Sequence, residues 1–365
     1  MDGIRRRRRA IAHDLTVSLA AAAIVAAATK LLSMIAPGLL TWPVPRWLVA
    51  AALPGTAAAF FLLGRRLNRH PPQAFVVISV PTWSRWIADL VRQLADTLGS
   101  NNIDLVLKYV PYDYSGRNQL RKLDSLRKTR SHTVGGFIIA AQPQHVLPEL
   151  VEFCTSTEYP IVFLDVLPFA DRRDYPARSA FVGCDARKIG EQAAEWVARD
   201  LRRQAVVDPH VLVMTGDAQH GRHERFTEVL WRLIPAVTID VIESGQFTRD
   251  RAYESATSYL RTRRRHGAAV HAVFCTNDEM ALGVLDAVQA RIAAGDDLTE
   301  LAVIGVDGIA EVRALINADN TQLRATIVQD ANRIAQTGVD ILLRMRGGAP
   351  SPGPVLIPTE LYPAG

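Results

Sequence analysis

The sequence predicts an α/β protein with two parallel-sheet half-domains, preceded by a membrane-associated N-terminal segment. From Ala74 onward, short β-branched runs alternate with longer amphipathic runs, a pattern typical of parallel strands joined by crossover helices. About ten such strands in the last 290 or so residues exceed what one simple doubly wound unit needs, which favours two half-domains. Two apolar runs within the first seventy residues have the length of membrane helices.

The N-terminal apolar runs predict a helical hairpin. Residues 15–36 carry one charge, Lys30, and at about 1.5 Å rise per residue they span about 33 Å, enough for a hydrocarbon core. Residues 47–63 form a second run, interrupted by a Pro-Gly pair that membrane helices tolerate. We therefore expect residues 1–70 to be a membrane anchor. A cleaved signal peptide is the alternative for the first run, since an Arg-rich start precedes it.

Charge is distributed unevenly along the chain. Residues 1–70 hold ten of the 42 basic residues and two of the 37 acids, which leaves 32 bases and 35 acids for the large domain. Nucleic-acid binding needs a concentrated positive field, and the Ala-rich start does not resemble a helix-turn-helix. We therefore do not expect a DNA-binding regulator. The arginines at 5–9 and 65–69 place both ends of the hairpin, and hence the domain, in the cytoplasm by the positive-inside rule.

The elements of the large domain follow in order along the chain. Strands are expected at 75–80, 103–110, 136–140, 161–165, 179–183, 210–214, 238–243, 272–276, 302–306 and 324–328, with a further strand at 355–361. Helices are expected between them, for example at 84–98, 187–203, 249–264, 278–294 and 331–345.

Polar residues follow several of these strands. Asp165, Asn277, Asp307 and Gln329 each stand at a strand end, and ligands of parallel sheets bind at the carboxyl ends of the strands. Each one alone is compatible with a helix N-cap, which is the expected role of the neighbouring acids Asp278 and Asp330. As a set they favour a site for a polyhydroxylated ligand, because carboxylates and amides serve hydroxyl groups.

Aromatic residues near the strand ends suit the C–H faces of a sugar ring. Trp83 and Trp86 follow the first strand, and Phe247 follows the run at 238–243. Plain core packing is the alternative for all three.

Three sequence blocks resemble the type I periplasmic binding proteins, in particular the ribose/galactose class. They are Phe274–Gly283 (FCTNDEMALG), Ile304–Gly308 (IGVDG) and Ala325–Asp330 (ATIVQD). The same fold forms the effector domain of lactose-repressor-type regulators. The resemblance runs from about Ala74 to Leu361 and implies two Rossmann-like parallel-sheet lobes joined by a three-strand hinge.

The resemblance also implies a set of sugar contacts. In the family, residues at the positions of Asp165, Asn277, Asp307 and Gln329 contact the sugar. Arg222 matches a hydroxyl-clamping arginine, although Arg225 stands where the family motif has glycine. The first loop and Gln142 depart from the family pattern, and Arg85 in that loop would favour a ligand with an acidic group. The expected ligand-binding residues are Asp165, Arg222, Asn277, Asp307, Gln329, Phe247, Trp83, Trp86, Arg85 and Gln142.

The expected domain organisation follows from this fold. Residues 74–183 with 330–348 form the first lobe, and residues 184–329 with 355–363 form the second. The chain crosses between lobes near 183–185, 329–331 and 347–354. A ligand held by both lobes stabilises their closed arrangement by hinge closure.

We expect the receptor component of a sugar ABC importer, anchored in the inner membrane with an ABC permease as its partner. The alternative is a membrane-tethered sensor that signals to another protein. The family places the domain outside the cytoplasm and the charge rule places it inside. We weigh the family location more, because both apolar runs are Ala-rich and give a moderate membrane signal.

The sequence does not favour an enzyme, a metal site or a cofactor. The stretch at 220–224 (HGRHE) has the wrong order for helical zinc motifs, and a phosphate-cradling glycine loop and a Gly-x-Ser-x-Gly motif are both missing. Cys154, Cys184 and Cys275 are far apart in apolar stretches, which indicates buried thiols.

Overall fold

The computed structural model describes residues 71–78, 84–110, 116–127, 132–140, 143–216 and 221–363. The predicted anchor spans and the predicted site residues Trp83 and Gln142 lie outside these residues. Within the described part, no helix combines the length and apolar character needed to cross a bilayer. Pro71–Gly365 group into one unit, which contains both predicted half-domains.

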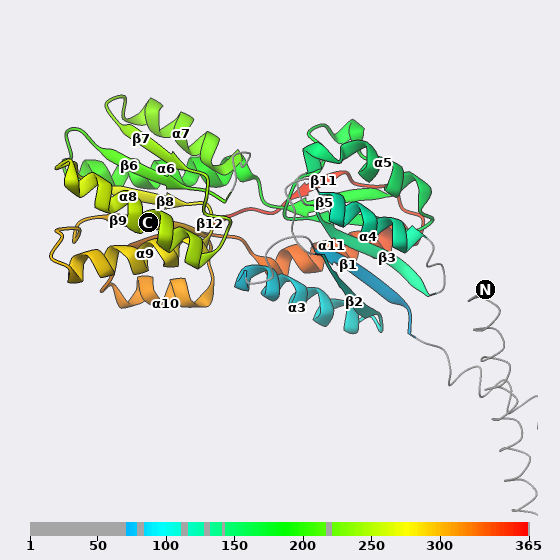
Figure 1. Cartoon of the computed structure of the whole chain (residues 1–365). Coiled ribbons are helices and arrows are strands. Elements are labelled where there is room, and N and C mark those ends of the chain that lie inside the picture. The colour runs from blue at the N-terminus through cyan, green and yellow to red at the C-terminus, as the bar shows by residue number, and fades with distance from the viewer. Residues whose placement is uncertain are drawn as a thin grey trace, which may run out of the picture. The chain divides into compact units, whose positions relative to one another are not determined.

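The first sheet has six parallel strands in the order β11-β5-β4-β3-β1-β2. Figure 1 labels β1, β2, β3, β5 and β11 of this sheet. Successive residues of a strand face opposite sides, so Val76 and Phe75 enter different cores. One core contains helices α3 and α11 and the other contains α4 and α5. We call this sheet with its helices the first lobe: β1 (Gln73–Ile78), α3 (Arg85–Gly99), β2 (Asp104–Tyr109), α4 (Arg117–Arg127), β3 (Thr133–Ile139), α5 (Leu147–Ser156), β4 (Ile161–Leu164), β5 (Ser179–Gly183), α11 (Ala331–Arg346) and β11 (Pro354–Leu356).

The second sheet has the order β12-β10-β9-β8-β6-β7, with β12 antiparallel to β10 and the other pairs parallel. Helix α6 packs against α7, and α8 packs against α9. We call this group the second lobe: α6 (Ala186–Arg203), β6 (His210–Met214), α7 (Gly221–Leu233), β7 (Thr238–Ile242), α8 (Arg249–Arg265), β8 (Ala272–Cys275), α9 (Asp278–Ala293), β9 (Ala302–Asp307), α10 (Ala310–Ala318), β10 (Leu323–Val328) and β12 (Glu360–Tyr362).

The last predicted strand, 355–361, is two strands. Residues of β11 pair with β5 in the first sheet, and β12 pairs with β10 in the second. Pro358 stands between them and cannot donate to a sheet ladder. The third crossing is therefore at 357–359 rather than at 347–354, and residues 355 and 356 belong to the first sheet rather than to the second lobe.

The turn after α11 explains this difference. Gly348 and Gly353 have positive φ angles of 93° and 73°, a conformation that glycine adopts without strain. They return the chain to the first sheet, where the Phe181 amide donates to the Gly353 carbonyl at 3.2 Å. The other two crossings connect β5 to α6 and β10 to α11, near the predicted positions.

Candidate functional site

Polar residues from both lobes meet where the strands end. Asp165 follows β4 of the first lobe, and Arg222 is the second residue of α7 in the second lobe. One Arg222 Nη lies 3.8 Å from Asp165 Oδ1, and the other donates to the Thr276 carbonyl at 2.7 Å. Asp307 interacts electrostatically with both Arg222 and Asp165, and Gln329 Nε2 donates to Asp307 Oδ1 at 2.8 Å. The structure thus brings together four of the residues that the sequence singled out: Asp165, Arg222, Asp307 and Gln329.

Two polar atoms in this group lack hydrogen-bond partners. They are Asp165 Oδ1 and Arg222 Nε, both of them buried; the ion-pair distance of 3.8 Å at Asp165 Oδ1 is too long for a hydrogen bond. Leaving a buried polar group unpaired costs about 1–3 kcal/mol, and more when the group is charged. Groups of this kind, from two different lobes, are suited to hydrogen-bond a polar ligand that reaches both of them.

The carboxyl groups of the site are strongly perturbed. Burial raises the pKa of Asp307 to about 7, against the lowering effects of Arg222 and of the hydrogen bond from Gln329. Burial also raises the pKa of Asp165, again opposed by Arg222. Both carboxyl groups thus interact with the same guanidinium, that of Arg222, so this group of residues contains more acidic side chains than basic ones.

Three of the predicted residues have a backbone conformation that is uncommon without glycine. The φ angles are 64° at Asp165, 57° at Phe247 and 115° at Asp307. Such conformations cost on the order of 1–3 kcal/mol each and are concentrated at functional sites. At Asp165 and Asp307, hydrogen bonds to the neighbouring strands fix the backbone: the Asp165 amide donates to Val182 and the Asp307 carbonyl accepts from Gln329, both at 3.3 Å.

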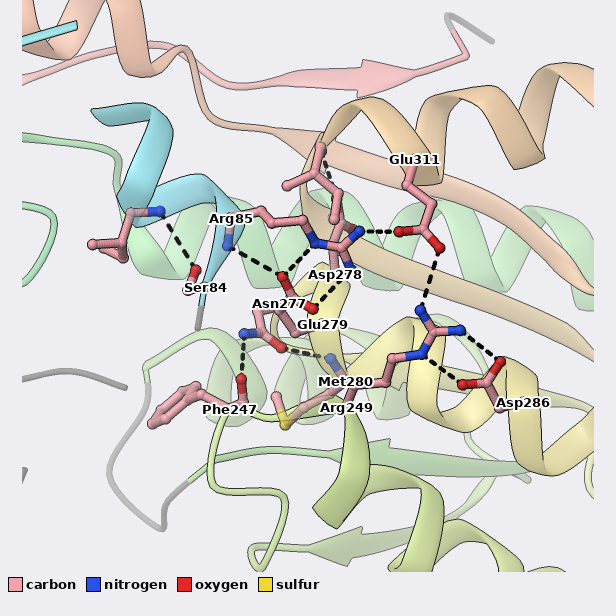
Figure 2. Close-up of polar contacts among 12 residues, drawn as sticks. Ser84, Arg85, Phe247, Arg249, Asn277, Asp278, Glu279, Met280, Asp286 and Glu311 are labelled. Atoms are coloured by element: carbon pink, nitrogen blue, oxygen red, sulfur yellow. Dashed lines mark hydrogen bonds and ion pairs between the residues drawn. The ribbon is translucent and has the colours of Figure 1, made fainter. Parts of the chain in front are cut away.

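Asn277 is engaged on both sides of its amide (Figure 2). Its Oδ1 accepts from the Met280 amide at 3.0 Å as the N-cap of α9, and its Nδ2 donates to the Phe247 carbonyl at 3.2 Å. The Phe247 ring lies on Gly216, where a Cβ atom would come within 2.4 Å of the ring. Asn277 therefore orients the Phe247 loop, and contact of either side chain with a ligand stays a prediction.

Arg85 and Trp86 have partners within the protein. The Arg85 guanidinium donates to both oxygens of Glu279, at 2.8 and 2.9 Å, and pairs with Glu311. This geometry gives no support to the expectation that Arg85 favours an acidic ligand. Trp86 is 5% exposed, packs in the core, and donates its indole N–H to the Gln329 carbonyl at 3.0 Å.

Asp278 is a buried residue that the sequence assigned to helix capping. The cap of α9 is Asn277, and Asp278 instead accepts from the Ile309 amide and the Thr326 hydroxyl, each at 2.8 Å. Burial raises the pKa of Asp278 well above its usual value, and Asp307 raises it further. The apolar run on either side of Asp278 was the available signal that this acid is buried.

The described residues contain neither a cluster of metal ligands nor an exposed thiol. In that part of the chain, no three His, Cys, Asp or Glu side chains are grouped to hold a metal ion. The three cysteines are buried and free, and burial raises the pKa of Cys154 and Cys184 to about 12, which keeps both as thiols.

Comparison with known proteins identifies the family of this chain. Residues 75–350 match the family model of the periplasmic binding protein domain. The chain belongs to this family. The resemblance found in the three sequence blocks is therefore confirmed. The family consists of substrate-binding proteins, which agrees with the expectation that the chain is not an enzyme.

The relatives and solved structures are sugar-binding proteins. The D-allose-binding periplasmic protein of Escherichia coli K12 is 26% identical over 169 residues, which cover 45% of this chain and 50% of that protein. A galactofuranose-binding protein has a similar structure, with a TM-score of 0.68 and 19% identity, covering 80% of this chain and 94% of that one. The fructose-binding periplasmic domain of a hybrid two-component system has a TM-score of 0.65 and 18% identity, covering 80% and 90%. At such identities the structures show the shared fold.

Proposed function

We propose that this chain binds a neutral monosaccharide or polyol between its two lobes, as the receptor of a sugar ABC importer. The observation that carries the proposal is the meeting of Asp165 and Arg222. These residues come from different lobes, lie 3.8 Å apart, and each has a buried atom without a hydrogen-bond partner. A ligand with several hydroxyl groups satisfies both at once, and so links the lobes.

The charges of the site favour a neutral ligand. Asp165 and Asp307 flank the single guanidinium of Arg222, and Arg85 is already paired with two carboxylates. An added carboxylate would face acidic groups without a free cation among these residues. The named ligands of the relatives, D-allose and galactofuranose, are neutral sugars.

The test is a binding screen of the full chain against pentoses, hexoses, polyols and sugar acids, read by thermal shift and calorimetry. A ligand that binds only the folded state raises the melting temperature. We expect stabilisation by one or more neutral sugars, and loss of at least tenfold in affinity for Asp165→Ala and Arg222→Ala, since each removes a charged partner in the site.

The control is Asp96→Ala, an exposed acid on α3 that pairs with Arg92 of the same helix. It should bind as the unaltered chain does. Preference for sugar acids, or full affinity in both site variants, would contradict the proposal.

The anchor is part of the proposal. The apolar runs at 15–36 and 47–63 support attachment to the inner membrane. We propose that the binding domain faces outward, as the family does, so that an ABC permease receives the ligand from the closed domain. The arginines after the second run support the opposite side, and a topology reporter fused to the C-terminus distinguishes the two.

A membrane-tethered sensor is the second candidate function. One structural neighbour is a fructose-binding periplasmic domain of a hybrid two-component system, so this fold also occurs in a signalling protein. Both candidates use the same binding chemistry and differ in partner. Uptake of radiolabelled sugar in cells with and without the gene separates them, because only the importer receptor changes uptake.

A further inference from the structure

A continuous series of ion pairs connects the two lobes beside the candidate site (Figure 2). Arg249 of α8 binds both oxygens of Asp286 at 2.6 and 2.8 Å and one oxygen of Glu311 at 3.2 Å. The other Glu311 oxygen pairs with Arg85, which also binds Glu279. Four of these five residues belong to the second lobe, and Arg85, at the start of α3, is the one from the first.

The Arg85–Glu279 contact has the geometry of a strong ion pair. Two parallel N–H···O bonds form the planar fork that arginine makes with a carboxylate. The Glu279 side chain is 9% exposed, so solvent screens the contact less than an ordinary surface pair. Burial alone raises the pKa of Glu279, but hydrogen bonds from Arg85 outweigh it and the pKa lies below its usual value.

Glu279 also completes the first turn of α3. Its Oε1 accepts from the backbone amide of Arg85 at 3.1 Å. The first turn of α3 contains no acidic residue of its own, although a helix N-terminus favours negative charge. The second lobe thus supplies to the first both a partner for its arginine and a carboxylate for its helix end.

We propose that Arg85 is a latch that holds the lobes together through Glu279 and Glu311, independently of the ligand. It acts as a positioning residue, because its guanidinium is bound by protein carboxylates. The inference rests on the proposed function only in that closure encloses the ligand. Closure by a neutral ligand would not depend on salt. Closure by Arg85 should depend on ionic strength, because its ion pairs are partly exposed.

The test measures the distance between the lobes without any ligand. Spin labels are placed on the exposed residues Ala95 of α3 and Ser258 of α8 after Ala95→Cys and Ser258→Cys, because the native cysteines are buried. Pulsed electron–electron resonance on the full chain then gives the fractions of short and long distances. Loss of charged hydrogen bonds in Arg85→Ala should raise the ratio of open to closed molecules about tenfold.

Two further variants keep the outcome decisive. Arg92→Ala is the matched control, since Arg92 lies on the same helix and pairs with Asp89 and Asp96 of that helix, and it should leave the distances unchanged. Arg85→Lys keeps the charge but loses the fork, so it should open the lobes less than Arg85→Ala does. Thermal melts by circular dichroism confirm that each variant is folded.

Salt provides a second, independent readout. Raising sodium chloride from 50 to 500 mM should increase the open fraction of the unaltered chain and should change Arg85→Ala little. Unchanged distances in Arg85→Ala, or a salt response equal in both proteins, would overturn the latch. These measurements contain no sugar, so a failure of sugar binding in the screen leaves their result interpretable, and the reverse also holds.

Discussion

The acids of the site are held in an unfavourable state by the surrounding fold. Asp307 combines a φ of 115° with 6% exposure and a hydrogen bond from Gln329. Both the backbone strain and the buried carboxyl reduce stability, so neither is explained by folding alone. They are explained if Asp307 binds a ligand, because a carboxyl group held in a fixed position strengthens binding even though it lowers the stability of the fold.

This argument predicts a pH dependence at Asp307. Its pKa is about 7 in the folded chain and near 3.8 when exposed, so the folded state keeps a proton that the unfolded state releases. Stability should therefore be greatest below about pH 4 for this group and fall as pH rises to about 7. In the unaltered chain, this group should lower the free energy of unfolding by on the order of 1–4 kcal/mol between pH 5 and 8. Asp307→Asn should abolish that decrease, which calorimetric melting measures.

The groups facing Asp307 limit how large the change will be. Arg222 lowers the pKa of Asp307, whereas Asp165 and Glu279 raise it. Burial also raises the pKa of Asp165 itself. Some pH dependence should remain in Asp307→Asn. An exposed control, Asp96→Asn, should follow the unaltered chain. A melting profile of Asp307→Asn that has the full pH dependence would show that Asp307 does not titrate in this range.

Residue roles were only partly readable from the sequence. The strand-end positions of Asp165, Asp307 and Gln329 follow from parallel-sheet geometry, and in the structure the three residues belong to one buried polar group, whose contact with a ligand stays a prediction. The pairing of Arg85 with Glu279 joins residues 194 positions apart and depends on how two lobes meet, which no local pattern contains. The sequence predicts a cap at Asp278 because aspartate is a favoured N-cap residue, and its position alone does not show that it is buried and bonded to Ile309 instead.

At the scale of elements, the close packing of α6 on α7 positions Arg222. Gly190 of α6 lies against the start of α7, where a Cβ atom would come within 2.1 Å of the Arg222 carbonyl. Gly190→Ala should force the helices apart, at a cost of about 1–3 kcal/mol, and should weaken sugar binding by moving Arg222. Thermal melting and calorimetry measure the two effects.

Gly221 supplies the matched control for this prediction. It begins α7 and faces α6, but its nearest neighbours, atoms of Ala186 and Arg187, lie at 3.8 Å from an added Cβ, an ordinary contact. Gly221→Ala should therefore leave stability and affinity close to those of the unaltered chain. Equal behaviour of the two variants would show that the helix spacing at Gly190 does not control the site.

Elements themselves were predictable where the hydrophobic period was clear. All ten main strands are present, because short β-branched runs leave a strong signal. Most of them are buried on both faces, whereas the edge strands β2 and β7 are partly exposed. The final run was misread as one strand, since 355–361 is short and its two halves pair with different sheets. Sheet membership is a property of pairing partners, which residue patterns do not specify.

At the scale of the whole molecule, two sheets share one chain that crosses between them three times. The crossings connect β5 to α6, β10 to α11 and β11 to β12. Trp86 ties the second crossing to the first lobe through its bond to Gln329, whose side chain holds Asp307 of the second. Two hydrogen bonds thus connect the first lobe, through the second crossing, to an acid of the site.

The N-terminal segment gives the last prediction. Pro71–Gly365 hold both sheets and the candidate site, whereas the apolar runs lie entirely before them. If the runs anchor the protein, the full chain should pellet with membranes and resist extraction by salt and alkali, because burial of a span in lipid does not depend on charge. A variant that begins at Pro71 should stay in the supernatant and bind the same sugars with the same affinity. Its folding is checked by circular dichroism before binding is measured. A full-length chain recovered in the supernatant would contradict the membrane anchor. A chain shortened at its N-terminus by cleavage after the first run would identify that run as a removed signal segment instead.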